Sequence, residues 1–318
     1  MGAEPLIDVH SHFLTDDYIS AARRAGIAQP DGTPQWPTWS EAAHLAMMDE
    51  HSIARSHLSI STPGVSFLSG EASRAMSRHL NEFAGALCEK RPDRFAFFAT
   101  LPLDAVGEAC AEAVRALDEL GASGVAVETN RNGVYLADPS LAPLWQLLHD
   151  RSAVVFVHPT SPTNWPQTAI GLPRPMLEFL FDSARAAVDL VLEGVLDRFG
   201  DIDWIFTHSA GVLPLVVDRV QFLRRAFFPD APEIDVVAAV SRLWFELAGT
   251  PFPRSAPIAA DAFGSDRLLF GSDFCFTPTA GVAAQIASLD AARPVAGRSW
   301  RGLTTVNATS LFPAKEAQ

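Results

Sequence analysis

The chain has little cysteine, no long apolar run and no surplus of positive charge. Only three cysteines occur among its 318 residues, which excludes a disulfide-stabilised scaffold and favours a reducing compartment. No segment approaches the roughly 20 consecutive apolar residues that a membrane helix needs. The 37 acidic against 24 basic residues give a formal net charge of −13. This balance disfavours nucleic acid as a partner, because binding a polyanion requires a basic surface.

Targeting and nucleotide-binding signals are also missing. No basic segment followed by an apolar stretch stands near the first residue, so we expect no signal peptide and a cytoplasmic protein. Neither a Gly-x-Gly-x-x-Gly turn nor a Walker loop occurs, so no nicotinamide, flavin or ATP cofactor is implied. The remaining composition, 48% hydrophobic and 19% charged, is typical of a globular protein with a large core.

Eight short apolar segments alternate with helical patterns along the chain. The segments are rich in Val, Ile, Phe and Leu, as in strands buried on both faces of a parallel sheet: residues 6–12, 57–62, 95–101, 124–129, 154–159, 203–209, 243–249 and 268–274. Between them, residues 107–121 and 183–199 carry apolar side chains at helical spacing. This alternation predicts an α/β fold, a (β/α)8 TIM barrel that forms a single domain over residues 1–318. The alternative is a doubly wound open sheet, which usually has a Gly-rich turn where this chain has His-Ser-His.

Four histidines and one aspartate stand at the ends of predicted strands. His10 and His12 close the first strand and lie two residues apart, so both rings point to the same face. His158 closes the fifth strand, His208 the sixth and Asp273 the eighth. In a barrel these ends converge on one rim, where active sites lie. Imidazole and carboxylate groups are suitable ligands for a borderline divalent metal, so we predict a metal centre at this rim.

The other five histidines have different surroundings. Four stand in helical or polar segments and are expected on the surface: His44, His51, His79 and His149. His57 opens the second predicted strand and is expected at the opposite rim. Two long irregular segments, residues 28–39 and 158–174, are rich in proline, glycine and tryptophan and follow histidine-ending strands. They are expected to be substrate loops, or else surface loops with small clusters of their own.

The same residues carry a family resemblance. The motifs DVHSH (8–12), VHPTSP (157–162), THSAG (207–211) and FGSD (270–273) occur in this order. Together they resemble the amidohydrolase superfamily, in particular the branch related to aminocarboxymuconate-semialdehyde decarboxylase. The resemblance covers residues 6–312 and implies a metal-dependent (β/α)8 barrel. The phrases SISTPGVSF (59–67) and NRNGVYLAD (130–138) are similar to 6-methylsalicylate decarboxylase, which points to a small aromatic or enol carboxylic acid as substrate.

The resemblance also implies roles for particular residues. One divalent ion, usually zinc and sometimes manganese, is held by the residues that match His10, His12, His158 and Asp273. The residue that matches His208 positions water or handles a proton. Arg219, eleven residues further on, matches an arginine that reaches a substrate carboxylate across the interface of a homodimer. The alternative for Arg219 is a helix-surface arginine paired with a neighbour.

The chain departs from the superfamily pattern in its fourth and seventh predicted strands. Binuclear members carry a carboxylated lysine on the fourth strand, and residues 124–129 contain no lysine. A single metal is therefore expected, although Glu128 could in principle replace the bridge. Glu246, in the seventh predicted strand, is assigned no role beyond lining the cavity.

The predicted pocket leads to three functional hypotheses. Phe13, Trp165 and Phe274 follow a ligand or lie on the loop after His158, so they are expected to form flat walls around a planar substrate. The leading hypothesis is a non-oxidative decarboxylase in which Asp273 or His208 donates the proton. The second is a metal-dependent hydrolase or hydratase acting on a lactone, amide or enol acid. The third, a non-catalytic metal-binding barrel, is disfavoured by the intact ligand set.

Overall fold

The protein is a parallel β-barrel, and the computed structural model describes residues 4–313. The strands follow one another in the order β1 (Leu6–His12), β2 (Ile53–Ser59), β3 (Phe95–Thr100), β4 (Gly124–Glu128), β7 (Val154–His158), β8 (Asp203–Phe206), β9 (Trp244–Glu246) and β10 (Leu268–Leu269). Isolated parallel bridges, Asp8 with Phe270 and Ser11 with Phe274, join the last strand to the first. The predicted TIM barrel is therefore confirmed. The predicted domain, residues 1–318, extends beyond the described residues at both ends.

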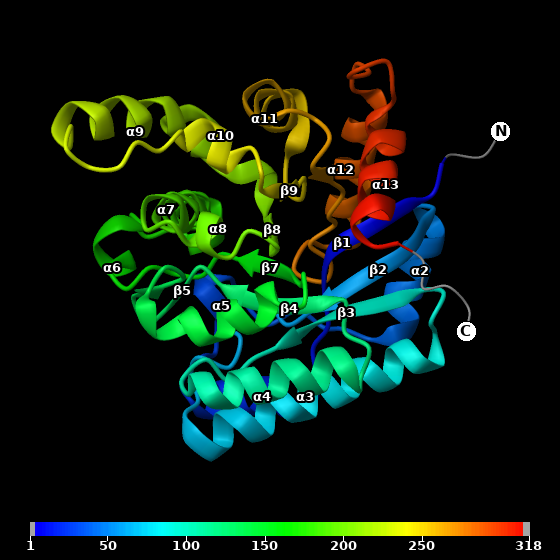
Figure 1. The fold of residues 1–318 in the computed structure, drawn as a ribbon. Helices are drawn as coiled ribbons and strands as arrows, with labels where there is room; N and C mark the ends of the chain where they lie inside the picture. The colour runs from blue at the N-terminus through cyan, green and yellow to red at the C-terminus, as the bar shows by residue number, and fades with distance from the viewer. Residues whose placement is uncertain (1–3, 314–318) are drawn as a thin grey trace.

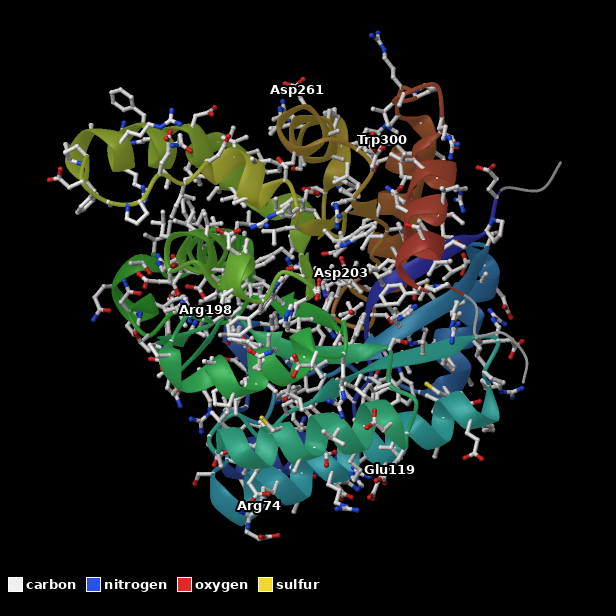
Figure 2. All side chains as sticks on the ribbon, in the orientation of Figure 1. Arg74, Glu119, Arg198, Asp203, Asp261 and Trp300 are labelled. Carbon is white, nitrogen blue, oxygen red and sulfur yellow. The ribbon has the colours of Figure 1, made fainter. Side chains whose placement is uncertain are left out.

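Helices form the outer layer of the barrel (Figure 1). They are α1 (Asp16–Arg24), α2 (Glu41–Glu50), α3 (Gly70–Lys90), α4 (Val106–Asp118), α5 (Ala142–His149), α6 (Trp165–Thr168), α7 (Glu178–Leu192), α8 (Val195–Arg198), α9 (Leu213–Phe227), α10 (Val236–Val240), α11 (Ala256–Phe263), α12 (Thr279–Ala291) and α13 (Trp300–Leu311). A small antiparallel hairpin, β5 (Asn130–Arg131) with β6 (Val134–Tyr135), follows β4. Charged side chains such as Arg74 point away from the barrel (Figure 2). Within residues 4–313, no helix combines the length and apolarity needed to span a membrane.

The predicted elements differ from the observed ones mainly at their ends. The segment 183–199, expected to be one helix, is divided between α7 and α8 at Gly194, which has a φ of +68°. Several strands stop earlier than their apolar runs. Strand β8 ends at Phe206, because the next residues enter a tight turn in which His208, Ser209 and Ala210 all have positive φ.

The inner core of the barrel is an apolar cluster to which six strands and α13 contribute: Val9, Phe98, Val154, Phe156, Ile205, Trp244, Leu269 and Ala308. Aromatic rings continue it in both directions along the barrel. The centroids of Phe98 and Phe156 lie 5.1 Å apart, and Phe156 lies 5.1 Å from His10. On the other side, His57 stacks on Phe98 at 5.4 Å. A continuous column of rings therefore separates the two ends of the barrel.

One expectation about the histidines is wrong. His44, predicted to be on the surface, is completely buried. Its Nδ1 atom accepts a hydrogen bond from the indole N–H of Trp39 at 3.1 Å, and its ring packs edge-on against Phe95 and Phe274. The cause is tertiary packing of α2 against β2, which the polar neighbours of His44 in the sequence do not indicate.

Candidate metal centre and active site

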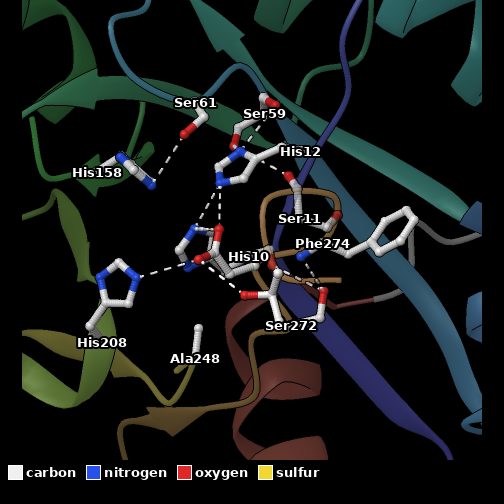
Figure 3. Close-up of polar contacts among 12 residues, drawn as sticks. His10, Ser11, His12, Ser59, Ser61, His158, His208, Ala248, Ser272 and Phe274 are labelled. Atoms are coloured by element: carbon white, nitrogen blue, oxygen red, sulfur yellow. Dashed lines mark hydrogen bonds and ion pairs between the residues drawn. The ribbon is translucent and has the colours of Figure 1, made fainter. Parts of the chain in front are cut away.

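Four side chains converge at the carboxyl end of the barrel strands. Each of them offers one ligand atom, and these atoms all lie within 4.8 Å of one another: His10, His12, His158 and Asp273. The Nε2 atoms of His10 and His12 are 3.0 Å apart, and Asp273 Oδ1 lies 3.2 Å from His12 Nε2 and 3.6 Å from His10 Nε2 (Figure 3). The structure thus brings together the four residues that the sequence predicts as ligands.

The far side of each imidazole is held by another group. The Nδ1 atom of His10 lies 2.8 Å from Glu246 Oε1. The Nδ1 atom of His12 lies 3.0 Å from Ser59 Oγ, and that of His158 lies 2.7 Å from the Pro159 carbonyl oxygen. The Nε2 atoms of His10 and His12 are therefore left for the common centre, and that of His158 has only a long contact of 3.5 Å with Ser61 Oγ. Such contacts fix the ring orientation of metal-bound histidines, so this donor set fits one divalent cation.

Glu246 is completely buried behind the cluster and does not line the cavity, which corrects the expectation from sequence. Its carboxylate contacts His10 Nδ1 and accepts backbone N–H bonds from His208 and Ala248, both at 2.6 Å. Strand β9 thereby orients a ligand from β1 and the turn that carries His208. The close fit explains Gly271, because a Cβ atom at that position would collide with the Glu246 carboxylate.

Asp8 is a site residue that the sequence reasoning missed. It is completely buried and accepts hydrogen bonds from Ser272 Oγ at 2.6 Å, Ser272 N at 3.0 Å and His10 N at 3.1 Å. The carboxyl group joins β1 to the segment that carries Asp273. Burial raises its pKa to about 7, partly offset by these hydrogen bonds. In the sequence, the feature that could have identified Asp8 is its position at the start of the DVHSH motif.

The protonation states of the cluster suit a cation. Burial lowers the pKa values of His12 and His158, and for His158 the neighbouring imidazoles lower it further. Burial alone would raise the pKa of Asp273, but contacts with His12 and His208 hold it well below its usual range. These side chains are therefore neutral imidazoles facing an ionised carboxylate, which is the state that divalent metals bind.

His208 lies beside the cluster without belonging to it. Its Nε2 atom is 3.8 Å from Asp273 Oδ2, and its ring centroid is 5.3 Å from that of His10. His208, His10 and Glu246 also offer ligand atoms within 4.8 Å of one another. However, Glu246 already has three polar partners, so this second group lacks a free carboxylate. His208 has a φ of +58° and Asp273 of +55°, and such strained backbone is typical of functional sites.

A cavity of about 490 Å³ opens beside the cluster. His158, His208 and Asp273 face it from the barrel, and Phe179 and Phe276 provide aromatic walls. Five prolines complete the lining: Pro30, Pro34, Pro37, Pro175 and Pro278. The loop of residues 28–39 therefore borders the cavity, as expected for a substrate loop. Of the second predicted loop, residues 158–174, only His158 lines this cavity, and residues 160–163 line a neighbouring one.

The aromatic residues expected from sequence lie elsewhere. Phe13 is buried in the core and stacks on Phe83 at 5.5 Å, because it points away from the barrel mouth. Phe274 is also buried and packs against His44. Trp165 is 38% exposed beneath the guanidinium of Arg174 and lines a neighbouring cavity instead. The aromatic walls of this cavity, Phe179 and Phe276, come from the first turn of α7 and from the loop after β10.

Two further predicted residues stand away from the cluster. Arg219 is exposed on α9 and does not line the cavity within its own chain. Glu128 lies at the end of β4, where its carboxylate packs against Gly64, and it is not among the grouped metal-ligating residues. This arrangement favours a single ion over a pair bridged by Glu128.

Known proteins resemble this chain in sequence and in fold. A family model described as Amidohydrolase matches residues 7–304. The decarboxylase yanB of Aspergillus niger is 31% identical, over 96% of this chain and 87% of its own. The 6-methylsalicylic acid decarboxylase of Penicillium expansum is 29% identical, over 86% of this chain and 85% of its own. A crystal structure of dihydroxybenzoic acid decarboxylase from Polaromonas, with bound manganese and the inhibitor 2-nitroresorcinol, has the same fold with a TM-score of 0.83 and 21% identity, covering 98% of this chain and 97% of that one.

Proposed function

Because the chain belongs to the amidohydrolase family, we propose that it is a metal-dependent, non-oxidative decarboxylase of a small aromatic carboxylic acid. The substrate class is a hydroxybenzoate-like acid with a hydroxyl beside the carboxylate. The observation that carries the proposal is the cluster of three imidazoles and one carboxylate on the wall of an aromatic-lined cavity. The decarboxylase names of its relatives support it.

The cluster is proposed to hold one divalent ion, zinc or manganese. Three imidazoles and a carboxylate suit zinc, whereas the Polaromonas relative was solved with manganese. When bound, the ion supplies positive charge that attracts the substrate oxygens and stabilises negative charge as it develops on them. Glu246 and Asp8 position the ligands from behind.

The cavity walls are proposed to orient the ring. Phe179 and Phe276 offer flat apolar surfaces on which a planar substrate can lie, and the volume of about 490 Å³ is in the range of small-molecule sites. Thr277 and Ser61, which also line the cavity, can hydrogen-bond to ring substituents.

His208 is proposed as the proton donor. Asp273 is the alternative, but its low pKa leaves it without a proton to give. The His208 ring faces the cavity and keeps its Nε2 atom near the reacting centre. A proton from His208 adds to the ring carbon that bears the carboxylate. The bond to the carboxylate then breaks, its electron pair restores the aromatic ring, and carbon dioxide leaves.

A substrate panel separates this function from the hydrolase alternative. Carbon dioxide release is measured for several hydroxybenzoates, and hydrolysis is measured for matched lactones and amides on the same preparation. Release of carbon dioxide from at least one hydroxybenzoate supports the proposal. Turnover of only the lactones or amides would establish a hydrolase, because the same ion can activate water.

We also propose that the protein works as a homodimer in a reducing compartment. Arg219 shares the exposed face of α9 with Leu215 (72% exposed) and Phe222 (68%), and α9 projects from the barrel (Figure 1). A second copy covering this face would bring its Arg219 toward the substrate cavity. Analytical ultracentrifugation should find a dimer that Phe222→Asp dissociates. A monomeric wild-type protein would refute the dimer.

The proposal of a reducing compartment rests on the cysteines. All three of them are free thiols, as a reducing compartment requires.

A further inference from the structure

A second cavity lies at the end of the barrel opposite the metal cluster. Its volume is about 810 Å³, and it is lined by the residues that lead into β7 and by the end of α13 with the segment after it. Arg55 and His57 of β2 face it, together with Arg151, Asp118 and Phe312. The column of rings from His57 to His10 fills the barrel between this cavity and the metal cluster.

His57 has unused hydrogen-bonding capacity at this cavity. It is completely buried, and neither of its ring nitrogens has a hydrogen-bond partner. The ring is held in place by Phe98 at 5.4 Å and Phe312 at 4.1 Å. Burial, with the charge of Arg55, lowers the pKa of His57 to about 3, so the ring is neutral at pH 7. A neutral imidazole offers one N–H donor and one acceptor, and leaving both unpaired in the interior lowers stability.

Arg55 stands beside His57 and also has a buried nitrogen without a hydrogen-bond partner. The two residues are two positions apart in β2, so their side chains leave the strand on the same face. The Nε atom of Arg55 is buried and has no hydrogen-bond partner. A half-buried guanidinium with a free donor, next to a buried imidazole with a free donor, is an arrangement that binds carboxylate oxygens.

The rest of the lining fits an anion with an apolar body. Arg151 lies 3.3 Å from Asp118, and this pair is partly exposed, so Arg55 leaves the cavity with one surplus positive charge. That charge stands out in a chain with a formal net charge of −13. Apolar side chains supply most of the remaining wall: Pro92, Leu117, Leu311, Phe312 and Pro313.

We propose that this cavity is a binding site for a small organic carboxylate, separate from the metal centre. The carboxylate pairs with Arg55 and accepts a hydrogen bond from His57, while its apolar body lies against Leu117 and Phe312. Packing alone does not explain His57, because a phenylalanine would fill the same space between Phe98 and Phe312 without unpaired nitrogens. The inference goes beyond the proposed reaction and does not depend on it.

Binding of benzoate to the full chain tests the proposal by calorimetry. Benzoate can also enter the metal centre, so the relevant event is the one that persists in Asp273→Ala. That event should be weakened about tenfold or more by Arg55→Gln, which removes the charged hydrogen bond but keeps a polar side chain. His57→Phe should weaken it too while keeping the ring stack. Arg23→Gln, an exposed arginine at the end of α1, is the matched control and should leave binding unchanged.

Several results would overturn the proposal. One is loss of all benzoate binding in Asp273→Ala, which would place the ligand at the metal centre alone. Another is undiminished binding in Arg55→Gln, a half-buried position whose variant is expected to fold. Inorganic phosphate serves as a second probe, since it has charge but no apolar body. Phosphate should bind this cavity more weakly than benzoate, and equal affinity would contradict the role of the apolar walls.

Discussion

The Glu246 carboxylate lies 2.8 Å from the Nδ1 atom of His10, and both side chains are completely buried. Burial would lower the pKa of His10, but the charge of Glu246 raises it. Burial would likewise raise the pKa of Glu246, but His10 lowers it. The pair therefore makes the His10 ring a more basic ligand and fixes its orientation. The buried carboxylate of Glu246 on β9 thus sets the orientation and basicity of the predicted ligand His10 on β1.

The first prediction concerns this pair. Glu246→Gln keeps the shape but removes the charge, so metal affinity should fall about 10- to 100-fold, as it does when such supporting groups are lost. Competition with a chromogenic chelator measures the affinity. Glu128→Gln is the matched control, because Glu128 lies outside the ligand group, and it should leave one ion per chain. A Glu246→Gln variant with unchanged affinity would mean that His10 needs no support from Glu246.

The second prediction assigns His208 a proton-transfer role. His208→Ala should retain the metal and the fold but lose about 10²-fold or more of its activity, the usual scale for a general acid or base. Metal content and turnover are measured on the same preparation. Loss of the metal would show that His208 is a ligand. Near-native turnover would exclude it as the proton donor.

The third prediction distinguishes the two sets of aromatic residues. Phe276→Ala removes a wall of the cavity beside the cluster and should raise KM about tenfold, because an aromatic contact contributes about 0.5–1.5 kcal/mol beyond its buried area. Trp165→Ala should change KM little, since that ring lies under Arg174 beside another cavity. The reverse ranking in steady-state kinetics would mean that the substrate extends into the cavity beside Trp165.

Local sequence was sufficient for the barrel and for the converging ligands, for two physical reasons. Buried parallel strands leave continuous apolar runs, and the ends of such strands meet at one rim, so His10, His158 and Asp273 could be placed together without coordinates. The environment of Glu246 could not be predicted in this way. Its partners, His10 and the turn at His208, are distant in sequence and are brought together only by closure of the barrel.

The aromatic walls of the cavity beside the cluster were mispredicted for a related reason. Phe13 directly follows the ligand His12. Because adjacent residues of a strand point to opposite faces, its ring packs outside the barrel, against Phe83. Phe179 and Phe276 lie in α7 and in a loop, where the path of the chain depends on tertiary packing. His44 was misjudged similarly, since its neighbours in sequence are polar while its neighbours in space are Trp39 and Phe95.

The fourth prediction is a pH dependence of stability caused by His57. Its folded pKa is about 3, below the value of 6.5 for an unperturbed imidazole. The unfolded chain therefore binds a proton that the folded chain refuses, and stability is lost as the pH falls below about 6.5. Between pH 6.5 and 5 this group alone should lower the free energy of unfolding by about 1.6 kcal/mol. Urea unfolding of wild type and His57→Phe across this range should show a smaller loss in the variant. Parallel curves would mean that His57 is not neutral in the folded protein.

The most direct test of the central claim is one turnover experiment in D2O. The metal-loaded protein is given 6-methylsalicylate or the hydroxybenzoate that the substrate panel identifies, and carbon dioxide and the phenolic product are counted together. The account predicts one carbon dioxide per product, one deuterium on the carbon that carried the carboxylate, and loss of both after chelation of the metal. Turnover without carbon dioxide, or carbon dioxide release that survives complete removal of the metal, would contradict it.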